Sequence, residues 1–258
     1  MISINQVKFI QSLKQKKFRE IHDQFIAEGS RLVLDLISSR FVVKEVFAEQ
    51  QWISLNRAIL GANNISFTLV SESEMSRISA LSSPSPVLSI VTIPEAAELP
   101  SSFQDEIILM LDDIKDPGNL GTIVRIADWF GIGTIICSEN MVDLYNPKVV
   151  QATMGSIARV KAIYANLGDF LQQIKGSTEV FGTFMSGENI YSCNLPSSGI
   201  IVIGNESNGI SKEVSEYVNT RLQIPSFANN NAPSAPESLN AAVATAIVCA
   251  EFRRQGIQ

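Results

Sequence analysis

The chain of 258 residues contains a single histidine, His22, and this scarcity excludes several catalytic chemistries. A Ser-His-Asp or Cys-His mechanism would have to use His22, which lies in a charged N-terminal stretch. A zinc site needs closely spaced cysteines and histidines, and no such spacing is present, so we expect no bound metal. Catalysis is therefore left to arginine, lysine, carboxylate, amide and hydroxyl groups, or to a cofactor.

Cysteines and long apolar runs are also scarce. The three cysteines are far apart and form no CxxC pair, which is typical of proteins of the reducing cytoplasm. The longest apolar run, 241–250, is interrupted by Thr245 and is shorter than the ~18–20 residues of a membrane-spanning helix. The N-terminal segment lacks the apolar core of a secretory signal. The sequence therefore predicts a cytoplasmic protein without a membrane partner.

Acidic residues outnumber basic ones, and the resulting net charge of -6 argues against a general nucleic-acid binder. Residues 1–60 are the exception, with nine basic and six acidic residues. Among them, Lys14, Lys16, Lys17 and Arg19 lie close together in the sequence. A helix that carries these four side chains could contact RNA phosphates, or it could present an ordinary solvated face.

Short β-rich runs alternate with helical patterns along most of the chain. The first series of runs, which includes a helix expected to begin after an N-cap at Ser71, ends near residue 94. Residues 95–106 hold prolines and small polar residues without periodicity, which is typical of a linker. Alternation resumes with 107–114, an apolar run suited to a buried parallel strand. The sequence therefore predicts an α/β protein with two domains, 1–94 and 107–258, the second built on a parallel sheet.

Three predicted strand ends carry unusual residues, and ligands of open parallel sheets bind at such ends. The first has Asn119 as the expected N-cap of a helix, with Arg125 two turns later. The second places Glu206 in a polar turn. Taken singly, each has an ordinary structural explanation as a cap, a turn or a salt-bridged arginine. The three segments lie at 112–131, 201–211 and 222–243.

Together these segments resemble the SpoU (TrmH-type) family of S-adenosylmethionine-dependent RNA 2′-O-ribose methyltransferases. In that family an N-x-G-x-x-x-R segment is followed by G-N-E-x-x-G and then by I-P and S-L-N. The chain matches them in this order at 119–125, 204–209, 224–225 and 238–240. Residues 149–160, VVQATMGSIARV, are similar to the family's segment between the first two motifs.

The N-terminal half carries the resemblance too, because KKFREIHDQFIAEG at 16–29 is similar to the family's substrate-binding domain, which is related to ribosomal-protein L30e-like folds. The resemblance implies an L30e-like RNA-binding domain at 1–94 and a SpoU methyltransferase domain at 107–258. It further implies that the C-terminal segment forms a trefoil knot and that the knotted domain forms a homodimer. One departure is 226–237, which is longer than in the family and contains three consecutive asparagines.

The resemblance implies S-adenosylmethionine as the cofactor, bound mostly by backbone groups in loops of the knot. It assigns the central catalytic role to Arg125. Since a guanidinium keeps its proton, we expect Arg125 to clamp a neighbouring phosphate and to stabilise the developing alkoxide. The expected catalytic residues are Arg125, Asn119, Glu206 and Asn240. The expected cofactor-binding residues are Thr183, Gly204, Ile224, Ser238 and Leu239.

The roles of the other catalytic candidates follow from the same resemblance. Asn119 would orient the target ribose or Arg125, and Glu206 would hold Arg125 or its own loop. Ser238 and Asn240 would order the start of the last helix. The RNA-binding residues would be the basic four at 14, 16, 17 and 19.

The resemblance implies an RNA substrate. Ribosomal RNA is favoured because family members with an added L30e-like domain often act on it, and transfer RNA is the alternative. A non-catalytic RNA-binding protein that retains the fold is a second hypothesis. An unrelated α/β nucleotide enzyme, such as an oxidoreductase, is a third, although the sequence lacks the glycine-rich fingerprint of such enzymes.

Overall fold

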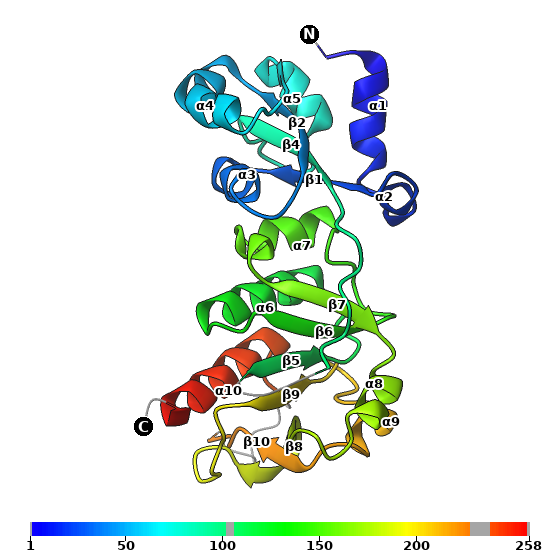
Figure 1. The fold of residues 1–258 in the computed structure, drawn as a ribbon, viewed down its shortest axis with the longest axis vertical. Helices are drawn as coiled ribbons and strands as arrows, with labels where there is room; N and C mark the ends of the chain where they lie inside the picture. Colours follow the sequence, from blue (N-terminus) through cyan, green and yellow to red (C-terminus); the bar gives the residue numbers. More distant parts are fainter. Residues whose placement is uncertain (1, 102–105, 228–237, 257–258) are drawn as a thin grey trace. The chain divides into compact units, whose positions relative to one another are not determined.

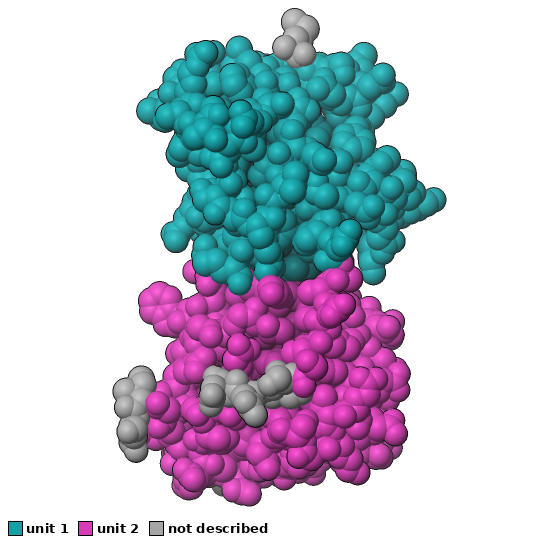
Figure 2. Space-filling view, viewed as in Figure 1, with its two compact units in different colours: residues 1–95, 143–159 teal, residues 96–142, 160–258 magenta. Residues whose placement is uncertain are grey.

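The computed structural model describes residues 2–101, 106–227 and 238–256, and it divides into two compact units. Unit 1 consists of Met1–Glu95 together with Asp143–Arg159, and unit 2 consists of Ala96–Val142 together with Val160–Gln258. Figure 2 colours the two units separately. The polypeptide therefore passes between the units three times, since a segment from the middle of the chain belongs to the N-terminal unit.

Unit 1 is built around a four-stranded sheet with the strand order β1-β4-β2-β3. Strand β4 is antiparallel to β1 and β2, whereas β2 and β3 are parallel. The strands are β1 (Gln24–Glu28), β2 (Val43–Ala48), β3 (Phe67–Leu69) and β4 (Val87–Thr92). The helices are α1 (Ile4–Ser12), α2 (Lys16–His22), α3 (Ser30–Ile37), α4 (Gln50–Ala62), α5 (Glu72–Ile78) and α7 (Pro147–Ala152), with a 3-10 turn η1 (Ser156–Ala158).

The segment 143–159 completes the core of unit 1. The rings of Phe25 in β1 and Tyr145 lie 4.9 Å apart between centroids. Burial raises the pKa of Tyr145 to about 12. Gly155 lies against Asp35 of α3, where a Cβ would be only 2.0 Å from Asp35 Oδ2, and the φ angle of Gly155 is +97°. Residue 155 must therefore be glycine for both steric and backbone reasons.

Unit 2 is an α/β unit with a six-stranded sheet in the order β10-β8-β9-β5-β6-β7, and every neighbouring pair is parallel. The strands are β5 (Ile107–Leu111), β6 (Thr134–Ser138), β7 (Lys161–Ala165), β8 (Val180–Asn189), β9 (Gly199–Ile203) and β10 (Thr220–Gln223). The helices are α6 (Pro117–Trp129), α8 (Leu167–Gln173), α9 (Lys212–Ser215) and α10 (Ala241–Gly256). No helix in the described ranges has the length and apolar character to span a bilayer.

Both faces of the central strands in unit 2 are covered, as their continuous apolar sequences require. Ile108 of β5 and Val202 of β9 belong to a core cluster with side chains of α8 and α9. Val180 of β8 belongs to the same cluster. Because side chains alternate along a strand, the next residue, Phe181, points to the opposite face. The Phe181 ring contacts the ring of Phe252 in α10, with centroids 5.1 Å apart. Helix α10 therefore packs on the other face, beside α6.

Helix α6 begins earlier than the sequence suggests, because the expected N-cap, Asn119, is already inside the helix. The N-cap is Asp116, whose Oδ1 accepts a hydrogen bond of 2.8 Å from Asn119 N. Pro117 follows. Proline suits the first turn of a helix because a backbone N–H at that position would have no partner within the helix. Asn119 consequently does not use its side chain for capping, and that side chain is available to the loops nearby.

Candidate functional site

The motif segments meet at one edge of the sheet in unit 2. Strands β10, β8, β9 and β5 are consecutive neighbours and parallel, so their carboxyl ends lie side by side (Figure 1). Three of the loops that leave this edge carry the residues picked out in the sequence. This is the edge at which open α/β sheets bind ligands.

Three side chains, one from each motif, form a continuous chain of hydrogen bonds at this edge. Asn240 Nδ2 donates to Asn119 Oδ1 over 2.8 Å. Asn119 Nδ2 in turn donates to Glu206 Oε1 over 2.6 Å. The partners are far apart in sequence, so the fold alone brings them together. Asn119 and Glu206 are half-buried, whereas Asn240 is exposed.

Asn240 is oriented by the start of helix α10. Its Oδ1 accepts hydrogen bonds from the backbone N–H groups of Ala242 (3.0 Å) and Val243 (3.3 Å). Asn240 is thus the N-cap of the last helix, as expected of a residue at this position. Ser238 is exposed and lies outside the helix.

Glu206 lies in a tight turn that folds back on the end of β9. Asn205 and Gly209 exchange two backbone hydrogen bonds of 2.9 and 3.0 Å. A Cβ at Gly204 would be 2.3 Å from the carbonyl carbon of Gly209, so only glycine fits there. The side chain of Asn205 also donates to Asp113 O over 2.8 Å. This bond ties the Glu206 turn to the loop after β5.

The two aspartates after β5 connect neighbouring strand ends, and the sequence analysis predicted no role for either. Asp112 is 6% exposed, and its Oδ2 accepts a 2.7 Å hydrogen bond from Ser211 N. Asp113 N donates to Ser138 Oγ at the end of β6 over 2.8 Å. The sequence did contain a signal for this role, namely two acidic residues directly after a buried strand. A carboxylate at such a place is buried and needs hydrogen-bond donors from nearby loops.

Arg125 lies apart from the chain of three side chains. It is exposed on α6, and it forms no hydrogen bond or ion pair within the described ranges. Trp129 follows four residues later on the same helix face and is 85% exposed. The structure thus joins Asn119, Glu206 and Asn240 directly and leaves the Arg125 guanidinium facing solvent.

Three of the residues expected to bind the cofactor lie on three adjacent strands, one within β8 and two directly after β9 and β10. Thr183 follows the last β8 residue that pairs with β9, and its Oγ1 donates to Val202 O over 3.2 Å. Gly204 follows β9, and the half-buried Ile224 follows β10. Leu239, just before α10, is 48% exposed. Most of the long segment 226–237 lies outside the described residues.

Two of the four basic residues expected to contact RNA are engaged within unit 1. Arg19 is 2% exposed. Its guanidinium donates to Asp143 Oδ2 from both Nε (3.0 Å) and an Nη atom (2.5 Å), and to Leu13 O. Lys14 Nζ donates to Ser79 O, just beyond the end of α5, over 2.7 Å. The burial of Arg19 leaves no donor for a phosphate, so the expected RNA contact of this residue is corrected to a structural role.

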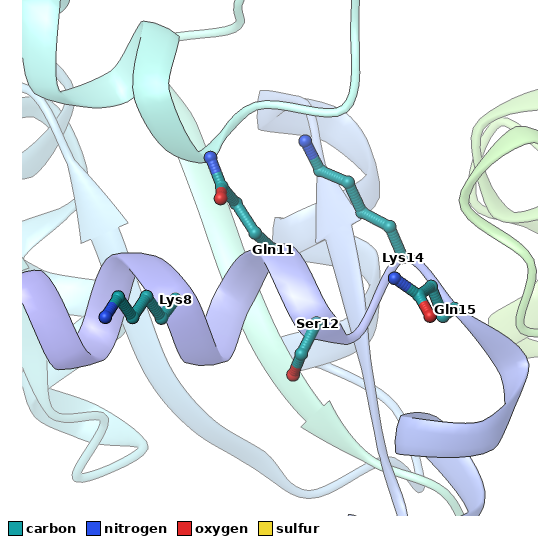
Figure 3. Close-up of a pocket in the computed structure, with 5 residues that line it drawn as sticks. All are labelled: Lys8, Gln11, Ser12, Lys14 and Gln15. Carbon is teal, nitrogen blue, oxygen red and sulfur yellow. The ribbon is translucent and has the colours of Figure 1, made fainter.

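Lys16 and Lys17 are exposed on α2. The Lys16 ammonium lies 3.7 Å from the Glu20 carboxylate, a solvated pair that phosphate can displace. Beside α2, a wide hollow of about 470 Å³ runs along α1 and the turn after it. Figure 3 shows that its lining side chains point in different directions, with Gln11 and Lys14 on one side of the ribbon and Ser12 on the other. The lining residues are Lys8, Gln11, Ser12, Lys14 and Gln15.

The buried cysteines contribute no nucleophile to unit 2. Burial raises the pKa of the Cys137 thiol well above its usual range. Burial also raises the pKa of Cys249 to about 12, although nearby Arg253 opposes the effect. Both thiols are therefore neutral at ordinary pH, and a neutral thiol is a poor nucleophile.

Two family models match the chain. Residues 106–250 match the SpoU rRNA methylase family. Residues 5–89 match the MRM3-like substrate-binding domain. The two matches together cover most of the sequence.

Curated relatives and solved structures agree with these models. A 23S rRNA (guanosine(2553)-2′-O)-methyltransferase, RlmP of Bacillus subtilis, is 27% identical over 96% of the chain and 95% of its own length. RlmB of Neisseria meningitidis, a 23S rRNA (guanosine-2′-O-)-methyltransferase, is 34% identical over 58% of the chain and 59% of its own length. An AdoMet-bound rRNA methyltransferase from Sinorhizobium meliloti superposes with a TM-score of 0.84 at 29% identity, covering 98% of this chain and 97% of that one. A TrmH-family protein from Porphyromonas gingivalis gives 0.87 at 36% identity, with 99% of each chain covered.

Proposed function

Because the chain belongs to the SpoU rRNA methylase family, we propose that it transfers a methyl group from S-adenosylmethionine to a ribose 2′-hydroxyl of ribosomal RNA. The observation that carries this proposal is the hydrogen-bonded chain of Asn119, Glu206 and Asn240. It unites the three family motifs at one strand edge, which is where a reaction site of this sheet is expected.

The strand ends suit S-adenosylmethionine chemically. Leu239 keeps almost half of its apolar side chain exposed beside them, and a purine ring could cover such a surface. Thr183 of β8 keeps a hydroxyl oxygen as an acceptor, and Gly204 and Ile224 offer backbone groups at the ends of β9 and β10, which flank β8. When bound, the cofactor supplies an activated methyl group with a neutral leaving group. The protein therefore has to position the ribose and to help its weakly acidic hydroxyl attack.

Arg125 is proposed to assist through its charge. Its guanidinium stays protonated at ordinary pH, so it can bind the phosphate next to the target ribose and stabilise negative charge that develops on the attacking oxygen. Its exposed position on α6 is compatible with reaching an RNA backbone. Asn119 and Glu206 face the same edge and are proposed to contact the ribose itself.

The decisive experiment measures transfer of labelled methyl groups to ribosomal RNA and to transfer RNA in separate reactions. We expect label in ribosomal RNA, and we expect Arg125→Ala to lower turnover about 100-fold or more while S-adenosylmethionine binding is retained. Wild-type turnover in this variant would contradict the role of Arg125. Label confined to transfer RNA would contradict the substrate class, and the absence of both label and cofactor binding would favour a non-catalytic RNA-binding protein.

We propose that unit 1 binds the RNA through the exposed face of α1 and α2. The lysines at positions 8, 16 and 17 and the amides of the hollow supply donors to phosphate oxygens, and Lys14 can add the N–H groups that its bond to Ser79 O leaves over. The net negative charge of the rest of the chain makes such a local basic surface necessary, since phosphate contacts dominate affinity for RNA.

We also propose a homodimer formed through unit 2. Helices α6 and α10 lie against each other, and both keep apolar side chains exposed, Trp129 at 85% and Val243 at 48%. A second copy that covers these side chains would bury them from water. The trefoil knot and the cytoplasmic location stay predictions from the sequence.

A further inference from the structure

The chain of three side chains in the candidate site has a direction, and helix α10 sets it. A carboxamide can donate from its nitrogen and accept at its oxygen, so its orientation depends on its partners. The backbone N–H groups of Ala242 and Val243 can only donate, so Asn240 must direct Oδ1 toward α10. Its Nδ2 is then directed toward Asn119.

The same reasoning fixes the next two groups. Asn119 receives a donor from Asn240, so its Oδ1 faces Asn240 and its Nδ2 faces Glu206. Glu206 then has to accept, and a carboxylate accepts more strongly than a neutral acid. Oε1 is the oxygen that Asn119 contacts, and in the described part of the chain Oε2 has no hydrogen-bond partner.

We propose that Asn240 is a positioning residue that sets the hydrogen-bond polarity of the site through Asn119. The polarity holds Glu206 as an acceptor whose second oxygen receives the hydrogen bond of the ribose 2′-hydroxyl. This inference rests on the proposed function, because it takes the ribose hydroxyl as the donor that Glu206 meets. It assigns to the cap of α10 a part in orienting the nucleophile, in addition to its part in the helix.

Asn240→Asp tests the direction with little change in shape. The new carboxylate still accepts from the N–H groups of Ala242 and Val243, so the cap of α10 is kept. It cannot donate to Asn119, which will turn its nitrogen toward position 240 and leave its oxygen facing Glu206. We expect kcat to fall about 10- to 100-fold, as for the loss of a hydrogen bond to a charged group. The KM values for RNA and S-adenosylmethionine should stay within about twofold.

Glu206→Gln tests the acceptor. The amide can still present its oxygen to Asn119, so the direction of the chain is kept, but its nitrogen then faces the substrate. The ribose hydroxyl loses its acceptor, and kcat should fall to a similar extent. Neither substitution removes atoms from the core, so the melting temperatures of both variants serve as folding controls.

The double variant Asn240→Asp with Glu206→Gln should again have a donor facing an acceptor at every link, with the direction of donation reversed. The carboxylate at 240 accepts from Asn119 Nδ2, Asn119 Oδ1 accepts from the amide at 206, and the oxygen of that amide again faces the ribose. We expect its kcat to exceed that of each single variant about tenfold. When Asn119→Ala is added to both single variants and to the double variant, this rescue should disappear, because Asn119 is what links the two positions among the described residues.

A double variant whose kcat does not exceed both single variants would overturn the inference, as would rescue that persists without Asn119. Failure of the proposed function is a separate result, because wild-type protein would then transfer no methyl group to either RNA pool. Active wild-type protein without rescue would contradict only the role of Asn240.

Discussion

Lys17 and Arg19 are close neighbours on α2, yet they have different surroundings. Lys17 is exposed, whereas Arg19 is buried and bonded to Asp143. We expect Arg19→Ala to lower the free energy of unfolding by about 3 kcal/mol, because Asp143 would lose its buried partner. Lys17→Ala should change stability by less than about 0.5 kcal/mol. Urea denaturation of the two variants measures this difference.

The same pair of variants separates RNA binding from stability. Lys17→Ala should weaken RNA binding and reduce the slope of log K against log salt by about one, because one phosphate contact is lost. An unchanged slope would contradict the proposed surface on α2. Arg19→Ala should leave the slope unchanged wherever the protein remains folded.

For single residues, the sequence predicted which side chains belong to the site better than it predicted what surrounds each of them. The motif pointed to Asn119, and its side chain does bond to those of the other two motifs. Its expected capping role was wrong because Asp116, three residues earlier, takes that role. The burial of Arg19 could not be predicted locally, since its partner Asp143 is 124 residues away in the sequence.

Among the elements, helix α10 contains a buried carboxylate near its end. Glu251 is 6% exposed and accepts hydrogen bonds from Arg254 and Gln255. Hydrogen bonds from Arg254 and then from Gln255 lower the pKa of Glu251 to about 2, against the opposing effect of burial. A lowered folded-state pKa stabilises the protein above the unfolded-state pKa of about 4.5. This contribution is lost as the pH falls from about 4.5 to about 2.

We therefore expect Glu251→Gln to destabilise the protein at pH 7 and to differ progressively less from wild type as the pH falls through this window. Unfolding by urea at pH 7, 5, 4 and 3 measures the difference. Glu139→Gln is a matched control, since Glu139 is exposed. A constant difference between wild type and Glu251→Gln down to pH 3 would show that the ionised carboxylate does not stabilise α10.

Strands were predicted well where their sequences are continuously apolar. Strand β5, Ile107–Leu111, is buried throughout and lies within the apolar run 107–114 that predicted it. Helix α5 begins after Ser71 in a capping box with Glu74, also as expected. The extension of β8 to Asn189 was not foreseen, because its second half is exposed and pairs with β10 only after a register shift. The extension depends on pairing with β10, which is distant in the sequence, and the local sequence pattern does not predict it.

Considered as a whole molecule, the protein exposes large apolar side chains in both units. Trp129 on α6 is 85% exposed and Leu55 on α4 is 77% exposed. If unit 2 forms the proposed homodimer, Trp129→Glu should yield a monomer, because a carboxylate would be buried without a partner. Leu55→Glu, in unit 1, should leave the dimer intact. Sedimentation equilibrium measures both masses, and a Trp129→Glu dimer would exclude Trp129 from the interface.

The overall architecture was within reach of the sequence, but the composition of the first unit was not. Alternating patterns and a proline-containing stretch at 95–106 predict two α/β regions. Segment 143–159 belongs with unit 1 because of contacts such as Phe25 with Tyr145 and Asp35 with Gly155. These contacts join positions that are distant in the sequence, so no local sequence pattern predicts them.

The chain's return to unit 1 at 143–159 also affects the order of events during synthesis. The ribosome finishes the first 95 residues well before it makes the segment that completes their core. At about 5–20 residues per second, the first unit has to wait several seconds for Tyr145 and Gly155. During that interval Phe25 lacks the ring of Tyr145, and Arg19 lacks the carboxylate of Asp143. Until residues 143–159 have been made, we therefore expect residues 1–95 to expose apolar surface that the complete unit buries.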